Sequence, residues 1–244
     1  MKNLKLILFV VLTLVVITSC QDRGNNGLFD CIKGEGNKVT QDLVIDEFHS
    51  VRLRGSSNVF ITQGLDFQVR VEGQQNIIDN IELDVKDGEW EIEFEECQRD
   101  FTKLEFHITM PVIKNLEVSG GGDIIGENDF LVNEIDLKVD GSGSIEVRVI
   151  DAQDVDARIS GSGKIIAKGN SNYIGSKVSG SGNLEAFDLE TNIANINISG
   201  SGDAEVTVFD ELDVKISGSG DVNYKGNPLV NVDITGSGDL NNSN

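Results

Sequence analysis

The sequence predicts an all-β protein whose main part is a right-handed β-solenoid, a stack of similar coils of about twenty residues each. Three observations lead to this prediction. A short phrase rich in Gly and Ser recurs every 18 to 21 residues between residues 119 and 240. Apolar and polar residues alternate on both sides of each copy, as in strands with one buried face. The phrase keeps its length, while the segments between copies vary.

The chain begins with a pattern typical of a secretory leader. Two lysines lie before an apolar run from Leu6 to Ile17, and two small residues follow before Cys20. The run is too short for a permanent membrane-spanning helix. We therefore expect residues 1–19 to be a signal peptide, and we exclude them from the fold.

Cys20 resembles the cysteine of bacterial lipoproteins, which becomes the lipidated N-terminus after cleavage. The alternative is ordinary cleavage before a free cysteine. Lipid attachment at Cys20 would hold the protein on the membrane of the cell envelope, and we expect the outer membrane. More than one acyl chain would be needed, because a single chain anchors only marginally.

Residues 20–43 are predicted to be an N-terminal tether, since their first part is rich in Gly and Asn. Two further cysteines, Cys31 and Cys97, lie in a compartment where disulfides persist. They form either a bridge, which would fix the tether to the first β units, or two separate thiols. A metal site or a nucleophile is not predicted, because neither cysteine lies in a spaced ligand motif and the chain has only two histidines.

Residues 44–111 are predicted to be a less regular section that caps the array. Alternating runs predict strands near residues 48–53, 81–85, 90–94 and 104–110, with an Asp87-Gly88 turn between the second and the third. One helical turn is expected at Asn76–Asn80, and Arg54 to Val59 is a worn further copy of the phrase. Most aromatic residues, including the single tryptophan, lie before residue 112. Bulky and irregular composition suits the capping end of a repeat array.

Residues 112–240 contain the repeats, and their columns define an inward and an outward face. The seven copies begin at Ser119, Asp140, Ser160, Ser179, Ser199, Ser217 and Thr235. Positions one, three and five before each of the last six copies are apolar, with Ser176 as the exception, and polar residues lie between them. Each unit is therefore expected to be a strand, a four-residue corner, a second strand and a variable return loop. An antiparallel meander of hairpins is the alternative, but stacked coils better explain a corner of constant length.

The corner phrase has a structural explanation and two ligand explanations. Its two glycines are predicted to supply positive φ and room for close stacking, and its serines to bond backbone groups. Phosphate binding is not expected, because no helix follows and acidic residues lie nearby. Calcium is an alternative, since the residue after the second glycine could be a ligand. That residue is an acid in four copies and not in three: Asp123, Asp203, Asp221 and Asp239, against Ser144, Lys164 and Asn183.

The net charge of the chain limits the classes of partner that can bind it. The formal net charge is −21, with 20 basic and 41 acidic residues. Such a surface repels nucleic acid, so no nucleic-acid partner is expected. Solubility outside the cell is the simplest explanation, and a cation-binding surface is the alternative. A carbohydrate-active enzyme on a β-helix would use paired carboxylates, but the acids are spread along outward strand positions. We therefore predict no catalytic residue and no cofactor.

Several segments resemble the head GIN domain of the auto-transporter adhesins, a family common in lipoproteins and secreted proteins of Bacteroidetes-type bacteria. These segments are Phe48 to Phe94, Met110-Pro111, the Ser-Gly-Ser-Gly-Asp ladder and Tyr224 to Pro228. The resemblance covers nearly the whole mature chain and assigns residues 44–240 to the head. It implies a β-helix-like head and a non-enzymatic envelope adhesin without defined catalytic residues. We expect an unknown protein or glycan partner to bind the flank of the solenoid or its capped end.

Overall fold

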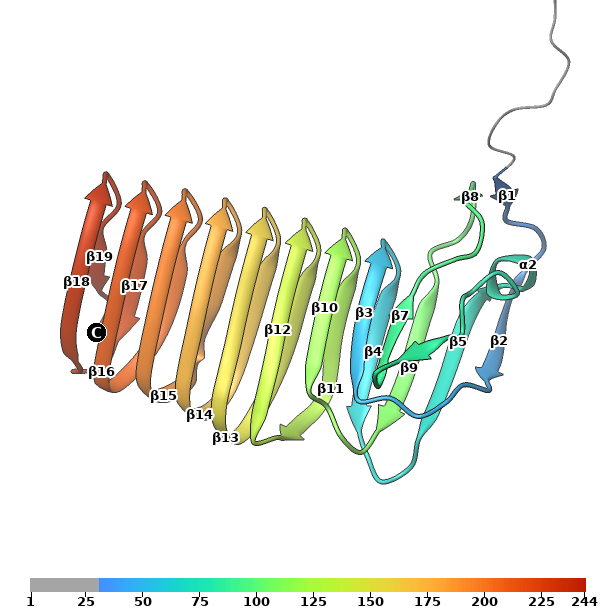
Figure 1. Ribbon diagram of the computed structural model, residues 1–244, viewed down its shortest axis with the longest axis horizontal. Helices are drawn as coiled ribbons and strands as arrows, with labels where there is room; N and C mark the ends of the chain where they lie inside the picture. The colour runs from blue at the N-terminus through green and yellow to red at the C-terminus, as the bar shows by residue number, and fades with distance from the viewer. Residues whose placement is uncertain (1–30) are drawn as a thin grey trace, which may run out of the picture. The chain divides into compact units, whose positions relative to one another are not determined.

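The computed structural model describes residues 31–244 and divides the chain into two units, Met1–Cys31 and Ile32–Asn244. The predicted signal peptide and Cys20 lie outside the described residues. The second unit is nearly all β, with 70% strand and 2% helix, and its coils stack into a β-solenoid of about 6 turns (Figure 1). Among residues 31–244, no helix has the length and apolar character needed to cross a bilayer.

The repeats form parallel, in-register coils. Their strands are β10 (Asn115–Gly120), β11 (Asp123–Leu131), β12 (Glu134–Gly141), β13 (Ser144–Gly161), β14 (Lys164–Gly180), β15 (Asn183–Gly200), β16 (Ala204–Gly218), β17 (Val222–Lys225), β18 (Leu229–Gly236) and β19 (Leu240–Asn242). Every pair between neighbouring coils in this part is parallel. The predicted solenoid is confirmed, and the antiparallel meander is wrong for these residues.

The return segments differ in form from the loops that the sequence predicted. In β13, β14 and β15 the strand continues through the return, so that each is 17 or 18 residues long. Length differences between coils are absorbed by register shifts inside these strands, such as the one between Ile166 and Gly169. The backbone thus keeps its inter-coil hydrogen bonds around most of each coil.

The apolar columns explain why the coils stack. Ile159, Val178, Ile198 and Ile216 pair in register along one column and are at most 2% exposed. The polar positions between them point outward, as period-2 alternation requires. Each coil therefore buries its own apolar face only by resting on its neighbours.

The cap begins as further coils and ends in antiparallel strands. Its elements are β1 (Ile32–Lys33), β2 (Lys38–Leu43), β3 (Ser50–Gly55), β4 (Asn58–Gln63), β5 (Gln68–Gln74), α2 (Gln75–Ile78), β6 (Val85–Lys86), β7 (Glu89–Ile92), β8 (Gln98–Arg99) and β9 (Glu105–Met110). Strands β3 and β4 continue the solenoid, because Gly55 pairs with Gly120 and Asn58 with Asp123. The worn copy of the phrase is therefore a true corner.

Antiparallel pairing and one helical turn close this end of the stack. β5 pairs antiparallel with both β9 and β2, and α2 contributes the buried Ile77 and Ile78. The predicted helical turn is confirmed, one residue earlier than expected. The strand predicted at residues 81–85 is reduced to β6 and an isolated bridge between Ile81 and Phe94. Residues 20–43 were expected to be a tether, but their last part forms β2. The backbone of β2 pairs with the edge of β5, so this part belongs to the sheet.

Candidate functional site

The corner phrase is held by backbone contacts between coils. Gly161 has φ +115°, and a Cβ there would lie 2.5 Å from the carbonyl oxygen of Gly141. The second glycine, Gly163, has no positive φ, yet its Cβ would lie 2.5 Å from the carbonyl oxygen of Gly143. Positive φ is thus needed at the first glycine only. At the second, the expectation of positive φ is wrong, and close approach of the coils explains the residue.

The corner amides find partners without the serine hydroxyls. The amides of Ser162 and Ser181 donate to the carbonyl groups of Gly141 and Gly161, one coil earlier, at 2.8 Å each. The sequence assigned this task to serine side chains, and the structure gives it to stacked backbone. The close approach of two glycine corners makes these bonds possible.

The aspartates that follow the second glycine also have structural partners. The amide of Asp221 donates to the Oδ1 of Asp203, and the amide of Asp239 to the Oδ1 of Asp221, at 2.8 Å each. The amide of Asp203 donates to the Oδ1 of Asn183 at 3.1 Å. Each side chain thereby caps a backbone amide of the next coil. Asn performs this task as well as Asp, which explains why the column tolerates both. Across residues 31–244, no three His, Cys, Asp or Glu residues gather where they could hold a metal ion.

Acidic residues of the cap line a cavity of about 320 Å³. They include Glu89, Glu91 and Glu93. Arg52 lies 3.3 Å from Glu89, and Arg54 pairs with both Glu91 and Glu93. The hydrogen bond from Arg54 to Glu91 raises the pKa of this guanidinium. These carboxylates therefore neutralise neighbouring arginines on the outer face of β3 and β7.

The two histidines lie in different places and have different neighbours. The ring of His107 stacks on Phe60 with centroids 4.9 Å apart. The Nδ1 of His49 lies 3.0 Å from the Oγ of Ser50, its neighbour in the sequence. A catalytic Ser–His pair needs a third group that orients the imidazole. In the part of the chain that the structure describes, no carboxylate is hydrogen-bonded to His49.

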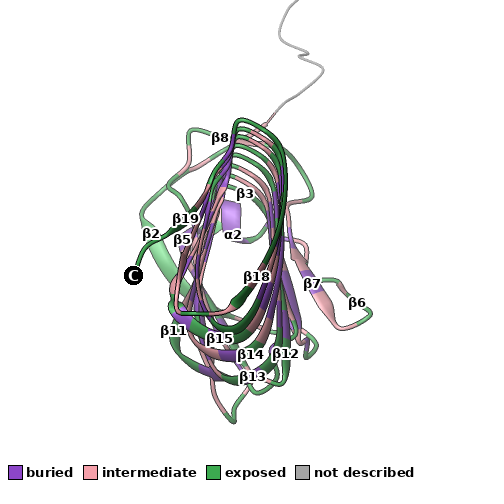
Figure 2. Cartoon of the chain, turned by 90° about the vertical axis from the view of Figure 1, so that its left-hand side faces the viewer, coloured by how far each residue is buried: buried purple, intermediate pink, exposed green. Residues whose placement is uncertain are grey.

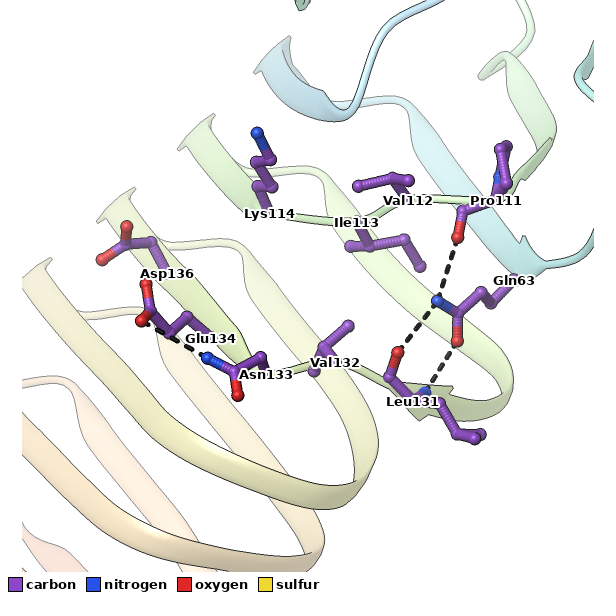
Figure 3. A pocket seen from close by; sticks show the side chains of 10 residues that line it. All are labelled: Gln63, Pro111, Val112, Ile113, Lys114, Leu131, Val132, Asn133, Glu134 and Asp136. Carbon is purple, nitrogen blue, oxygen red and sulfur yellow. Dashed lines mark hydrogen bonds between the residues drawn. The ribbon is translucent and has the colours of Figure 1, made fainter.

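An open groove lies where the cap meets the repeats. It has a volume of about 450 Å³ and lies between the link from β9 to β10 and the link from β11 to β12 (Figure 3). We call it the Gln63 groove, and it is lined by Gln63, Pro111, Val112, Ile113, Lys114, Leu131, Val132, Asn133, Glu134 and Asp136.

Gln63 fixes both links that form the groove. Its Nε2 donates to the carbonyl oxygens of Pro111 and Leu131 at 3.2 Å each, and its Oε1 accepts from the amide of Leu131 at 2.7 Å (Figure 3). The backbone of Gln63 exchanges two further bonds, of 2.9 Å each, with the side chain of Asn128. One amide side chain at the end of β4 thus holds the two segments in a single arrangement.

The lining of the groove combines apolar and charged groups. Val112 is 49% exposed and Leu131 is 71% exposed, above the buried Ile113. Lys114, Glu134 and Asp136 supply an ammonium and two carboxylates at the rim. Exposed apolar side chains beside a few polar groups are typical of binding sites.

The sequence alone did not predict this groove, although it contains one signal. Phe130, Leu131 and Val132 are three consecutive apolar residues, which breaks the alternation of the repeats. In the structure Phe130 is buried while Leu131 is exposed. A register shift between Ile125 and Asp129 lies just before this segment.

Cys31 and Cys97 each come directly before a strand of a small separate sheet. The amide of Ile32 donates to the carbonyl of Cys97 at 2.8 Å, and β1 pairs with β8. Cys31 and Cys97 are each disulfide-bonded. Their direct linkage, which the sequence offered as one alternative, stays a prediction. Cys20 lies outside the described residues, so its lipidation also stays a prediction.

Comparisons with known proteins identify relatives of this architecture. The family model described as "Putative auto-transporter adhesin, head GIN domain" matches residues 47–228. A search of the curated proteins found no match to the chain. A crystal structure of a "putative adhesin" from Bacteroides fragilis superposes with a TM-score of 0.82 at 24% identity, covering 86% of this chain and 99% of that one.

Two structures from Parabacteroides distasonis are also similar. One is described as a "putative adhesin" and has a TM-score of 0.71 at 25% identity, covering 87% of this chain and 100% of that one. The other is described as a "putative lipid binding protein" and has a TM-score of 0.74 at 24% identity, covering 87% of this chain and 99% of that one.

Proposed function

The chain belongs to the auto-transporter adhesin, head GIN domain family, and from this premise we propose that it is a non-enzymatic adhesin of the cell envelope. It presents the solenoid as a rigid support and binds a protein or glycan partner in the Gln63 groove. The observation that carries the proposal is the groove itself, an open site whose two walls are held together by one buttressing side chain.

The composition of the groove suits recognition rather than reaction. A glycan or peptide would meet exposed apolar surface at Val112 and Leu131, and polar groups at Lys114 and Glu134. Several acids of the outer strand faces take part in ion pairs or cap amides of the next coil, which favours a structural role for them over the enzyme alternative. The aspartates that could be calcium ligands cap backbone amides of the next coil, and this structural role favours the adhesin proposal over a calcium-stabilised scaffold.

The test is a binding screen of the full-length protein against glycan arrays, matrix proteins and whole cells. Leu131→Asp, which places a charge at the exposed wall, is expected to lower binding at least tenfold. Val44→Asp is the matched control, because Val44 is 95% exposed and lies outside the groove. Equal binding by both variants would disprove the assignment of the site.

Lipid vesicles form a separate arm of this screen. One structural neighbour is described as a lipid-binding protein, and the groove has exposed apolar side chains. Binding to vesicles alone, with no protein or glycan ligand, would replace the adhesin proposal by lipid binding.

We further propose that Cys20 carries the lipid that places the head on the outer membrane. The apolar leader and the small residues before Cys20 support this. Cys20→Ala is expected to abolish incorporation of labelled palmitate and to release the protein from membranes. Unchanged labelling would contradict the assignment.

A bond between Cys31 and Cys97 would tie the tether to the segment directly before β8. Peptide mapping of the unreduced protein is expected to recover the two cysteines in one linked fragment. Recovery of either cysteine linked elsewhere, or as an alkylated thiol, would contradict the bond.

A further inference from the structure

The two ends of the solenoid differ in how their apolar interior is covered. At one end α2 lies across the stack, with Ile77 and Ile78 at 0% and 3% exposure. At the other end the last coil presents β18, which among residues 31–244 pairs only with β16. Figure 2 looks onto this second end, where β18 is drawn as exposed while α2 is visible behind it, through the coils.

The exposure of β18 breaks the inward columns of the repeats. Val232 and Ile234 pair in register with Val214 and Ile216, and they occupy the same inward positions. The side chains on β16 are 4% and 0% exposed, whereas Val232 and Ile234 are 46% and 38% exposed. In the earlier coils these inward apolar groups are covered by the coil that follows. In the last coil they are exposed.

The edge of β18 has few of the features that discourage strand pairing. Asp233 is its one charged residue, and no Pro, Lys or Arg lies within it. Natural proteins usually protect a long edge strand with such residues, with a bulge or with a covering segment. An eight-residue edge without them, with four large apolar side chains, is suited to pairing with another strand.

We propose that β18 is the interface of a two-fold symmetric dimer, in which the C-terminal ends of two copies of this chain meet. A head-to-tail arrangement is disfavoured, because the opposite end already has its interior covered by α2. Two C-terminal ends are alike in lacking a cover. Their union is closed, since each copy uses the same surface.

The sequence of β18 is self-complementary in an antiparallel register centred on Val232. In this register Val232 faces its own symmetry mate, and Val230 faces Ile234 of the other copy. Residues directly opposite in an antiparallel pair lie on the same face of the sheet. All of these apolar groups therefore remain on the inward side, and the two cores become continuous.

The outward face of the same register pairs an amide with a carboxylate. Asn231 lies opposite Asp233 of the other copy, and the two-fold axis creates this pair twice. Within one chain, Asn231 already donates to the Oδ1 of Asp213 at 3.1 Å. Its amide has a second hydrogen to donate. A centre one residue away would place Asp233 opposite itself, or Asn231 opposite itself, and would lose this match.

Cysteine crosslinking of the full-length protein tests the register directly. Val232→Cys is expected to form a disulfide-linked dimer on mild oxidation. Asp213→Cys is the matched control, since Asp213 lies at an outward position one coil earlier, and it is expected to form no disulfide-linked dimer under the same oxidation. Absence of the crosslink with Val232→Cys, or equal crosslinking of both variants, would overturn the proposal.

Sedimentation of the full-length protein in mild detergent tests the charge match independently. Asn231→Asp would place like charges opposite each other twice, and is expected to raise the dimer dissociation constant about tenfold. Asn231→Lys would create two opposite-charge pairs and is expected to lower it. Asn195→Lys, two coils earlier in the same column, is expected to leave it unchanged.

Circular dichroism of each variant separates loss of folding from loss of association. Association that responds equally to the Asn231 and Asn195 variants would show that the dimer forms elsewhere. A wild-type chain that stays monomeric at every concentration would overturn the proposal, even if β18 captured a strand of another protein.

Discussion

The carboxylate of Glu117 lies 3.1 Å from the Nζ of Lys138 on the next coil. Glu117 is 5% exposed although it is on the outer face, because it is flanked by Lys138 and by Arg52 of the preceding coil. Charges of opposite sign thus stack in one outward column where the cap meets the repeats. This column links the two parts of the head electrostatically.

Loss of the Glu117 charge should destabilise the head. Glu117→Gln leaves Arg52 and Lys138 without their shared partner, and the expected loss is about 2 kcal/mol in the free energy of unfolding. The control is Asp129→Asn, whose ion pair with Arg148 is about half exposed, and it is expected to cost less than about 1 kcal/mol. Urea unfolding measures both. Equal losses would contradict the role of burial.

The stability should fall at alkaline pH through Lys138. Hydrogen bonding to Asp140, and then to Glu117, raises the pKa of Lys138 above its ordinary value of 10.5. Because the folded pKa is the higher one, the stabilisation is complete below pH 10.5 and is lost as the pH rises through the folded pKa. The difference in unfolding free energy between wild type and Lys138→Met should therefore shrink above that pH. A constant difference from pH 8 to pH 12 would contradict this.

The second corner glycine should be intolerant of any side chain. Gly163→Ala would place a Cβ against the carbonyl of Gly143, and we expect a loss of about 2 kcal/mol or more. Ser162→Ala is the control, because Ser162 is exposed in the same corner. Its effect should stay within about 0.5 kcal/mol. Thermal unfolding of both variants would reveal the contrast.

The one polar residue in the inward columns should be replaceable with a gain in stability. Ser176 is 5% exposed, and in the described part of the chain its Oγ has no hydrogen-bond partner. Ser176→Ala removes this buried hydroxyl and should stabilise the head by about 1 kcal/mol. Ser171→Ala should instead destabilise it, because Ser171 bonds the buried Thr191 at 3.1 Å. A loss of stability with Ser176→Ala would indicate a partner for that hydroxyl.

The aspartate ladder should act without calcium. Asp221→Ala removes the cap on the amide of Asp239 and is expected to cost about 1 kcal/mol, while Asp221→Asn should retain most of the stability. The melting temperature of the wild type should be the same in calcium and in chelator, since only a ligand of the folded state raises it. A higher melting temperature in calcium would restore the calcium alternative.

The sequence predicted the solenoid because repetition makes the same physical demand many times. A column such as Ile159, Val178 and Ile198 is apolar in every copy, so the buried face could be identified without a structure. The cap was predicted less well, since each of its contacts occurs once. The pairing of β2 with β5 joins a segment that the sequence placed in the tether to a strand more than twenty residues away.

By itself, the sequence determined the coil length, the inward columns, the corner positions and the family. Tertiary structure alone decided what the polar residues do. Whether Asp221 is a metal ligand or an amide cap depends on the register of the next coil, and whether Glu117 is exposed depends on the two coils beside it. The Gln63 groove and the uncovered edge of β18 were likewise decided in three dimensions. Period-2 alternation says which way a side chain points, but only the packed neighbours settle what it meets.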